Sequence, residues 1–454
     1  MEFNRHILTD LSRWKKETPR KPLILRGARQ VGKTTMVKQF ANSYKQFIYL
    51  NLEKSEDRKY FENFDDVLKI TTSIFLDKGL KEDWDNTLLF IDEIQESPIA
   101  IQLLRYFYEE LPELHVIAAG SLLEFALGDV KSFPVGRVSY LYLFPFNFEE
   151  FLEASNKTRL VDELNNIPVN DFAHHSLIKQ FHEYALIGGM PEVVQRYMAK
   201  KKLIGLSAIY ESIWGTYKDD VKKYAKNETE KKVIELILST AAQQLDQRVK
   251  FKNFGNSNYK SREVGEALRR LDDARIIQLI YPTTDLTFPL KPDFKKAPRL
   301  QFLDTGLVNH ILAIQSEMLA MEDLNDAYKG ALMPHLITQE LISINTISSK
   351  KPIFWVREKT QSSAEVDLVV SYKSMIIPIE IKSGKTGKLK SLHQFIDKTN
   401  HPYAVRMYAG EFKIEQHTTQ FGTPYLLMNL PYYLGTKLHD YIEHFVKNHT
   451  LNKS

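Results

Sequence analysis

Three apolar segments near the N-terminus of the chain are followed by, or end in, small or polar residues. They span residues 23–25, 87–93 and 115–121, and a helix-like segment at 35–40 follows the first of them. Uninterrupted apolar runs of this length are typical of strands that are buried on both faces of a parallel sheet. The pattern therefore predicts an N-terminal α/β domain with a parallel sheet.

The middle of the chain is predicted to be mainly helical before its pattern changes. Residues 207–240 have a helical pattern with many alternating charges, which is typical of a solvated face. A helix at 231–242, a turn region and a second amphipathic helix that begins near Ser261 come next. Strands are expected at 276–281 and 300–303, with a long loop between them. This order of helix, turn, helix and hairpin predicts a winged helix.

The C-terminal part combines a helix with alternating strands. An amphipathic helix is expected at 335–347, and strands are expected at 353–357, 364–370 and 375–381. The predicted fold class of the whole chain is therefore α/β, with a parallel-sheet domain first, then a winged helix, then a second α/β domain.

The composition is that of a large soluble globular protein with several domains. The chain has 454 residues, of which 43% are hydrophobic and 26% are charged, and this length suggests about three domains. It has no cysteine, which excludes disulfides and thiolate metal sites. A formal net charge of +4 excludes a strongly polybasic protein, so affinity for nucleic acid has to be judged from local clusters.

The N-terminus and the apolar runs indicate a cytoplasmic protein without a membrane partner. Residues 1–6 lack the apolar core of a signal peptide. No uninterrupted apolar run approaches the roughly 18 residues that a membrane-spanning helix needs. We therefore expect neither a secretion signal nor a membrane span.

A phosphate-binding loop of the pattern GxxxxGK[ST] occupies residues 27–34, between the first apolar run and the helix-like segment. Its glycines allow backbone N–H groups to turn around phosphates, Lys33 can reach the β and γ oxygens of ATP, and the Thr34 hydroxyl can bind Mg²⁺. The alternative is a Gly-rich turn before an ordinary helix. The residues predicted to bind ATP are Gly27, Ala28, Arg29, Gln30, Val31, Gly32, Lys33, Thr34 and Thr35.

Two acidic residues end the second apolar run. A phosphate loop that hydrolyses ATP needs carboxylates to hold Mg²⁺ and to orient the attacking water. We expect Asp92 to join Thr34 in the Mg²⁺ shell and Glu93 to polarise the water, because Glu93 falls beyond the strand end. The alternative is a pair of solvated acids at a strand terminus.

Two further residues are candidates for catalysis by their position. Ser121 ends the third apolar run and can contact the γ-phosphate or the water, although Gly-Ser after a strand also occurs as a simple turn. Arg137 follows a Pro-Val-Gly turn and can stabilise transition-state charge in its own or a neighbouring subunit, or simply bind a helix terminus. Action on a neighbouring subunit is compatible with a homo-oligomer.

The chain resembles the prokaryotic AAA-like ATPases that carry a C-terminal domain similar to the PD-(D/E)xK nucleases. The likeness covers most of the chain, from the phosphate loop through LLFIDEIQ, AAGSLLEF, VGRV, LFPFNFEEFL and IGGMPEVV. The turn at 188–191 and the segment at 302–307 look particular to this family. The expected domains are an AAA-type P-loop core at 1–155, a helical lid at 156–229, a winged helix at 230–310 and a restriction-endonuclease-like α/β domain at 311–454.

A basic surface is expected on the predicted winged helix. Its second helix carries Lys260, Arg262, Arg269 and Arg270, and the hairpin loop adds Lys291, Lys295 and Lys296. Basic residues on a recognition helix and a wing suit contacts with the DNA backbone and entry into a groove. The alternative is a protein-interaction module on which these residues are simply solvated.

A group of charged residues on the last predicted strands resembles the nuclease motif of this family. Glu380 and Lys382 are two residues apart and project to one face, with Asp367 on the neighbouring strand. Asp367 and Glu380 can bind a divalent metal, Mg²⁺ or Mn²⁺, and Lys382 can position or deprotonate a water for phosphodiester hydrolysis. Glu340 on the upstream helix joins the candidate catalytic set, and a basic loop at 383–390 suits a DNA backbone. The alternative is a site that has decayed or that only binds.

Three hypotheses follow for the whole chain. The first is an ATPase whose C-terminal site cuts or grips DNA. The second is an ATP-gated DNA-binding switch with an inert nuclease-like domain, and the third is a nucleotide-dependent protein-interaction module. The presence of all four candidate residues of the C-terminal site favours the first, whereas the modest net charge keeps the third open.

Overall fold

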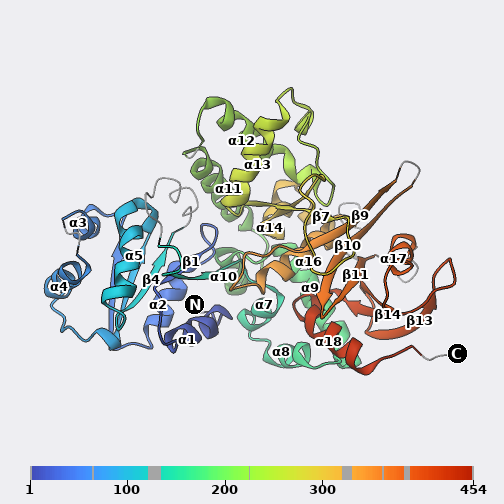
Figure 1. Cartoon of the computed structure of the whole chain (residues 1–454), viewed down its shortest axis with the longest axis horizontal. Helices are drawn as coiled ribbons and strands as arrows, with labels where there is room; N and C mark the ends of the chain where they lie inside the picture. The colour runs from blue at the N-terminus through green and yellow to red at the C-terminus, as the bar shows by residue number, and fades with distance from the viewer. Residues whose placement is uncertain are drawn as a thin grey trace. The chain divides into compact units, whose positions relative to one another are not determined.

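Two compact units make up the chain, each built around its own sheet (Figure 1). The computed structural model describes residues 3–63, 66–120, 134–223, 225–319, 330–359, 362–382 and 389–451. The first unit comprises Met1–Pro145 and two short later segments, Asp273–Ile276 and Asn345–Ser349, and the second unit contains the remainder. No helix among the described residues is long and apolar enough to cross a membrane.

A parallel sheet of five strands forms the centre of the first unit. Its strands are β1 (Leu23–Arg26), β2 (Gln46–Asn51), β3 (Thr87–Asp92), β4 (His115–Ala119) and β5 (Ser139–Tyr142), in the order β2-β3-β4-β1-β5. All neighbouring strands run parallel, which confirms the predicted α/β core. The carboxyl ends of parallel strands share one edge of a sheet, so the residues that follow β1, β3 and β4 come together there.

Helices cover both faces of this sheet. They are α1 (Ile7–Lys15), α2 (Lys33–Ala41), α3 (Ser55–Asn63), α4 (Val67–Asp77) and α5 (Pro98–Glu110). Helices α3, α4 and α5 share one hydrophobic cluster with alternate strand residues such as Ile48, Leu89 and Val116. Helix α2 packs on α1 and lies against β3 and β4, with Val37 and Phe40 buried outside that cluster. The two groups of helices therefore bury opposite faces of the strands.

The two later segments complete the first unit through specific contacts. The Tyr142 amide at the end of β5 donates to the carbonyl oxygen of Thr346 (2.7 Å), and the Thr346 hydroxyl donates to Asp10 on α1 (2.7 Å). The Arg275 guanidinium lies 4.5 Å from the centre of the Tyr142 ring. Residues far apart in the sequence thus belong to the unit that carries the phosphate loop.

Helices dominate the first half of the second unit. They are α7 (Phe148–Ala154), α8 (Thr158–Asn165), α9 (His174–Ile187), α10 (Pro191–Lys200), α11 (Leu206–Lys223) and α12 (Glu228–Thr240). A capping box begins α7, because Asn147 accepts from the Glu150 amide while Glu150 reaches back to the Asn147 amide. Pro191 opens α10, where its missing N–H costs no helical hydrogen bond. The helical character expected at 156–229 is present, and its role as a lid stays a prediction.

The two segments that look particular to the resembling family meet inside the second unit. Asp304, which is fully buried, precedes α14 (Thr305–Ile311) and accepts a hydrogen bond from the Gly189 amide (2.6 Å). Asn309 of α14 donates to the carbonyl oxygen of Leu186 near the end of α9 (3.0 Å). The turn after α9 and the beginning of α14 therefore form one buried polar joint.

The elements expected for a winged helix are present in the predicted order. Helices α12 and α13 (Ser261–Asp273) are followed by an antiparallel pair, β6 (Ile277–Ile280) and β8 (Arg299–Phe302). The segment between these strands adds β7 (Pro282–Thr283), which pairs in parallel with β9 (Ile353–Lys359). The hairpin is thus joined to the C-terminal sheet, a connection that local periodicity does not reveal. The assignment as a winged helix stays a prediction.

A sheet of seven strands forms the C-terminal part of the second unit. Its further strands are β10 (Ser362–Tyr372), β11 (Met375–Ile381), β12 (Tyr403–Tyr408), β13 (Lys413–Thr418) and β14 (Pro424–Pro431). The order is β13-β14-β12-β11-β10-β9-β7, and β9, β10 and β11 are antiparallel neighbours, as their alternation indicated. Helix α17 (Lys390–Ile396) packs against β10 and β11, and α18 (Leu438–Asn448) follows β14.

The helix expected at 335–347 is α16 (Leu332–Ser343), and every one of its residues is buried. It contacts α14, β8 and the turn at Tyr432–Lys437, whereas α15 (Gln315–Met318) is a short helix after α14. The expected amphipathic character is wrong, because α16 is enclosed by the unit and has no solvent face.

Candidate functional site

The phosphate loop lies between β1 and α2, as predicted. A methyl group on Gly27 would overlap the carbonyl oxygen of Leu143, so only glycine allows the loop to pass this close to the backbone. Helix α2 begins at Lys33, and the first amides of a helix have no partner within it. Together with the positive end of the helix dipole, these amides make the loop a site for anions.

Lys33 is buried against the loop. Its ammonium donates to the carbonyl oxygens of Gly27 (2.9 Å) and Ala28 (2.9 Å). Burial lowers the pKa of Lys33 to about 8, while the carboxylates of Glu93 and Asp92 act in the opposite direction. A phosphate group would therefore stabilise the charged form of this buried side chain.

Thr34 and Asp92 lie in direct contact at the carboxyl edge of the sheet. The Thr34 hydroxyl donates to the buried Asp92 carboxylate (2.8 Å), which also accepts from the Tyr49 hydroxyl (3.2 Å) and the Glu93 amide (3.1 Å). A hydroxyl and a carboxylate held together beside a phosphate loop are oxygen ligands that suit Mg²⁺. Tyr49 belongs to no motif, and only its place on β2 beside β3 brings it to this site.

Glu93 is held by a neighbour whose role had no separate sequence signal. The side-chain amide of Gln95 donates to the Glu93 carboxylate (2.6 Å), and the Glu93 backbone has a left-handed φ of 51°. A methyl group on Gly120, directly after β4, would overlap the Gln95 side chain. Burial raises the pKa of Glu93, while the hydrogen bond from Gln95 and the charge of Lys33 lower it. Gln95 therefore sets the position of the Glu93 carboxylate at the strand ends.

The structure describes Arg137 but not Ser121, the two remaining catalytic candidates of the first unit. Ser121 lies outside the described residues. The Arg137 guanidinium donates to Glu109 at the end of α5 (2.8 Å), and both side chains are partly exposed. A surface ion pair of this kind contributes little to stability, so Arg137 can exchange Glu109 for another anion.

The C-terminal candidates Asp367, Glu380 and Lys382 lie together on β10 and at the end of β11. The register of these strands makes Asp367 and Glu380 neighbours. The Lys382 ammonium lies 2.9 Å from one Glu380 oxygen, and Asp367 accepts a hydrogen bond from the Ile381 amide (2.8 Å). The structure thus brings these residues together as their spacing predicted.

Charge in this group is strongly affected by burial. Glu380 is 3% exposed, and its second carboxylate oxygen has no hydrogen-bond partner among the described residues. Burial and then the Asp367 carboxylate raise the pKa of Glu380. Burial would lower the pKa of Lys382, but its contact with Glu380 outweighs this and the net shift is upward. Lys382 is therefore a charge partner of Glu380 rather than a base in this arrangement.

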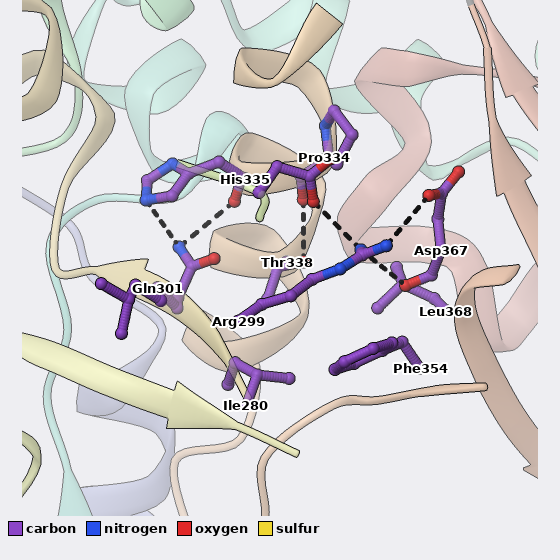
Figure 2. A pocket seen from close by; sticks show the side chains of 11 residues that line it. Ile280, Arg299, Gln301, Pro334, His335, Thr338, Phe354, Asp367 and Leu368 are labelled. Atoms are coloured by element: carbon purple, nitrogen blue, oxygen red, sulfur yellow. Dashed lines mark hydrogen bonds and ion pairs between the residues drawn. The ribbon is translucent and has the colours of Figure 1, made fainter. Parts of the chain in front are cut away.

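Arg299 of β8 enters the same group, and no motif in the sequence connects it with Asp367. Its guanidinium forms ion pairs with Asp246 (3.0 Å), Glu365 and Asp367 (3.5 Å). Figure 2 shows the Arg299 side chain extending toward Asp367 beside the Phe354 ring. The guanidinium carbon of Arg299 lies 4.5 Å from the centre of this ring. The available signal was a charged residue at the start of an otherwise buried strand.

This arrangement does not fit a bound divalent metal ion. One oxygen of the Asp367 carboxylate accepts from an amide, and the other faces the Arg299 guanidinium. Within the described ranges, no group of three or more His, Cys, Asp or Glu residues is placed to hold a metal ion. The carboxylates expected for a metal are present, but the cation that faces Asp367 is Arg299.

Glu340 does not join this group. Its fully buried carboxylate contacts the Phe148 amide (3.1 Å) and the Tyr184 hydroxyl (2.7 Å), and that hydroxyl also lies 2.8 Å from the carbonyl oxygen of Phe146. Tyr184 has one hydroxyl hydrogen for these two acceptors, so a protonated Glu340 would satisfy the second contact by donating to Tyr184. Burial raises the pKa of Glu340 to about 8, in agreement with a neutral acid.

Glu340→Gln should remove a pH dependence of stability. The folded pKa of about 8 exceeds the roughly 4.3 of an unfolded glutamate, so the folded state binds the extra proton. Wild-type stability therefore falls as pH rises through this window, by at most about 1.4 kcal/mol per pH unit from this group. The amide of the variant can donate to Tyr184 as the protonated acid does, so the variant should exceed wild type in stability above the window.

Urea unfolding from about pH 5 to pH 9 measures this difference. Glu228→Gln, at an exposed position of α12, is the control and should follow wild type. A Glu340→Gln protein with the wild-type pH slope would contradict the protonated state.

The expected basic surface is partly present. The exposed basic residues are Lys260, which directly precedes α13, Arg262 and Arg269 of α13, and Lys291 and Lys295 of the hairpin loop. Arg270 forms a largely buried ion pair with Glu230 (2.8 Å), and Lys296 pairs with Glu358 of β9 (2.6 Å). The expectation of an outward-facing side chain is wrong for Arg270, whereas Lys296 stays partly exposed and has its charge neutralised by Glu358. The basic loop lies outside the described residues at 383–388.

Comparison with known proteins matches three parts of the chain to family models. Residues 178–318 and 329–427 match two families described as domains of unknown function. A Haemophilus influenzae protein described as "Uncharacterized protein" is 25% identical over 205 residues, which are 42% of this chain and 44% of that protein. The chain thus spans less than half the length of this curated relative. Residues 19–152 match the family described as "AAA domain", which supports an AAA-like, nucleotide-binding ATPase.

Proposed function

We propose that the chain hydrolyses ATP to ADP and phosphate in a Mg²⁺-dependent reaction at the carboxyl edge of the first sheet. The contact of Thr34 with Asp92 (2.8 Å), next to buried Lys33 and Glu93, carries this proposal. A hydroxyl and a carboxylate held together beside an anion site suit Mg²⁺, and the nearby Glu93 carboxylate suits the attacking water. An AAA-like core supports the same assignment.

Each residue has a distinct role in this reaction. Residues 27–35 bind the phosphates through backbone amides, and Lys33 neutralises the β and γ oxygens. Thr34 and Asp92 hold Mg²⁺, which supplies positive charge to the phosphates when it is bound. Glu93 polarises the attacking water, so that the new bond to the γ-phosphorus forms as the bond to the β–γ bridging oxygen breaks.

Ser121 and Arg137 are assigned supporting roles. Ser121 contacts the γ-phosphate or the water, and Arg137 stabilises transition-state charge in its own subunit or in a neighbouring subunit of a homo-oligomer. The weak surface pair of Arg137 with Glu109 supports this role, because it can be given up at little cost.

Release of phosphate from ATP tests the function directly. Lys33→Ala should lower kcat/KM by at least about a hundredfold, because a buried charge partner of the phosphates is lost. Lys59→Ala, at an exposed position on α3 of the same unit, should leave the rate unchanged. Wild-type protein without Mg²⁺-dependent hydrolysis, or a Lys33→Ala protein with the wild-type rate, would refute the assignment.

A second candidate function is action on DNA by the second unit. The observation in its favour is the set of five exposed basic residues on α13, directly before it and in the hairpin loop. Side chains of this kind contact phosphate backbones with an affinity that falls as salt rises. The grouping of Asp367, Glu380 and Lys382 supports a nuclease-like domain that grips or cuts this DNA. An ATP-gated switch with an inert domain is the alternative.

Labelled duplex and single-stranded DNA, with Mg²⁺ or Mn²⁺ and with or without ATP, distinguish these outcomes. Replacing Lys260, Arg262 and Arg269 by Ala should weaken binding and reduce the salt dependence by about one unit of slope per lost phosphate contact. The exposed residues Lys179, Lys200 and Lys202 provide a control with the same charge change. Cleavage that disappears in Asp367→Ala supports a nuclease, binding without cleavage supports the switch, and no binding at low salt refutes both.

A further inference from the structure

The Arg299 guanidinium is enclosed by acids from two separate parts of the second unit. Asp246 lies between α12 and α13, whereas Glu365 and Asp367 lie on β10, and ion pairs join all three to Arg299. The Arg299 side chain is only 11% exposed. Burial alone would lower the pKa of Arg299, but the three carboxylates raise it, so this side chain is a permanent cation.

Arg299 and a divalent metal ion would compete for Asp367. Both need the same carboxylate, and the guanidinium already lies 3.5 Å from one of its oxygens. Two cations that share one partly buried carboxylate repel each other strongly, because the low local dielectric screens them weakly. The ion pair and a metal ion at Asp367 therefore exclude each other.

Glu380 supplies an independent sign that the site is incomplete. It is 3% exposed, and the oxygen that Lys382 does not contact has no hydrogen-bond partner among the described residues. A buried acceptor without a partner is costly and needs an explanation. This oxygen belongs to the neighbour of Asp367 across the strand pair, where a ligand would be shared.

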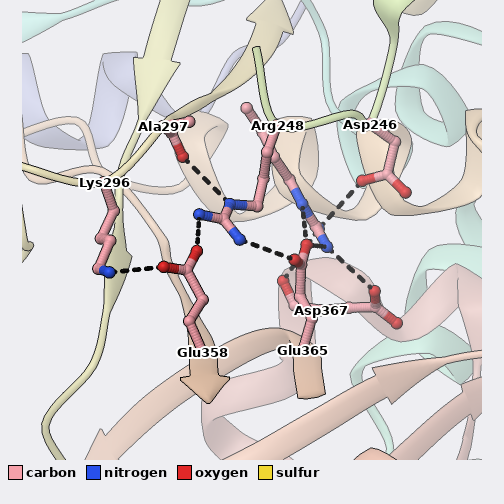
Figure 3. A network of polar contacts seen from close by, with 8 residues as sticks. Asp246, Arg248, Lys296, Ala297, Glu358, Glu365 and Asp367 are labelled. Carbon is pink, nitrogen blue, oxygen red and sulfur yellow. Dashed lines mark hydrogen bonds and ion pairs between the residues drawn. The ribbon is translucent and has the colours of Figure 1, made fainter. Parts of the chain in front are cut away.

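The hairpin holds Arg299 in place. Arg299 begins β8 and forms an isolated β-bridge with Arg248. Figure 3 shows Arg248 and Lys296 meeting Glu358 of β9, with a separation of 2.6 Å for the lysine pair. Strand β7, which lies in the connection between β6 and β8, pairs with β9 at the edge of the sheet. These contacts thus hold the hairpin, and with it the backbone of Arg299, against β9.

We propose that Arg299 is the resident cation of the Asp367 site and excludes a divalent metal ion from it while the β6–β8 hairpin is bound to β9. The proposal rests on the nuclease-like interpretation of the second unit. It adds a condition to that function: Asp367 and Glu380 become available to a metal only after Arg299 has left. The presence of Asp367 and Glu380 alone is therefore not sufficient for metal binding.

Mn²⁺ binding to the full chain, without nucleotide or DNA, tests the proposal. Electron paramagnetic resonance counts free Mn²⁺ in titrations of wild type, Asp367→Asn, Arg299→Gln and the double variant. Wild type and Asp367→Asn should bind Mn²⁺ equally, because Asp367 is closed to metal in both. Arg299→Gln should gain one Mn²⁺ site, with an affinity at least about tenfold higher than that of Mn²⁺ for Asp367 in wild type. The double variant should lack this new site.

Arg262→Gln is the control for the loss of one positive charge. This arginine is exposed on α13 and pairs with Glu266 of the same helix, outside the group around Arg299, so its loss should not create the site. Because Arg299→Gln leaves three acids facing one another, thermal unfolding is followed as well. Mn²⁺ should raise the melting temperature of this variant and not that of wild type, since a ligand stabilises only the state that binds it.

Two results would overturn the proposal. One is weaker Mn²⁺ binding by Asp367→Asn than by wild type, which would mean that Asp367 already holds metal beside Arg299. The other is an Arg299→Gln protein that Mn²⁺ neither binds in the new site nor stabilises. Neither result depends on ATP hydrolysis or DNA cleavage, so a failure of the proposed function is measured separately.

Discussion

Glu93→Gln is expected to retain ATP binding while lowering kcat by at least about a hundredfold. The amide has nearly the same size as the carboxylate and can still contact Gln95, which lies 2.6 Å from Glu93. It cannot attract a proton from the attacking water. Because Lys33, Thr34 and Asp92 are untouched, the affinity for ATP should stay close to that of wild type. Equilibrium binding of a fluorescent ATP analogue and steady-state phosphate release measure the two quantities.

Glu96→Gln is the matched control for this experiment. Glu96 is an exposed glutamate three residues further along the chain and should be replaceable without a change in kcat. Unchanged hydrolysis in Glu93→Gln would remove Glu93 from its catalytic role. A parallel loss of ATP binding would instead indicate a damaged phosphate site, and Glu93 would then belong to the binding of the nucleotide.

Gly306→Ala is expected to destabilise the second unit by about 3 kcal/mol or more. A methyl group at this position would overlap the carbonyl oxygen and carbon of Ile187 at the end of α9. That oxygen already accepts from the Tyr210 hydroxyl (2.7 Å), and Asp304 ties the same turn to α14 through Gly189. The backbone cannot withdraw without breaking these bonds. Calorimetry should show a melting temperature for this unit that is lower by roughly 5–10 °C.

Gly215→Ala is the control, because nothing lies within 4 Å of the added methyl group. Gly215 lies in α11 of the same unit, where alanine is the better helix former by roughly 1 kcal/mol, so a small gain in stability is expected. Binding of ATP by the first unit should be unaffected by either change. Equal melting temperatures of Gly306→Ala and wild type would show that the joint between α9 and α14 is less rigid than its contacts indicate.

The N-terminal site could be predicted because its principal residues lie in two short continuous segments. Loop chemistry and strand polarity are local properties, so residues 27–35 and the pair Asp92 and Glu93 could be assigned from their neighbours alone. Tyr49 could not be predicted in this way, since only the pairing of β2 with β3 brings it to Asp92. Gln95 is the last residue of the LLFIDEIQ segment. Its contact with Glu93 depends on the left-handed backbone of Glu93, which the sequence does not reveal.

Of the C-terminal site, only the residues on adjacent strands of one sheet could be predicted from the sequence. The two-residue period of a strand explains why Asp367, Glu380 and Lys382 come together. Arg299 contacts Asp367 across 68 positions of the chain, through a hairpin that pairs with the edge of that sheet. Periodicity also could not tell that α16 is covered on all sides, because it reports the pattern of one helix and not what surrounds it. Glu340 was therefore placed in a site rather than in the core.

A fragment that stops at residue 152, where the AAA-domain match ends, would lack part of its own fold. Thr346 accepts from Tyr142 on β5 and donates to Asp10 on α1. Truncation would leave the amide of an edge strand and a helix carboxylate without these partners. An isolated nucleotide-binding piece should therefore aggregate unless a peptide covering Asn345–Ser349 is added in trans or grafted onto its end.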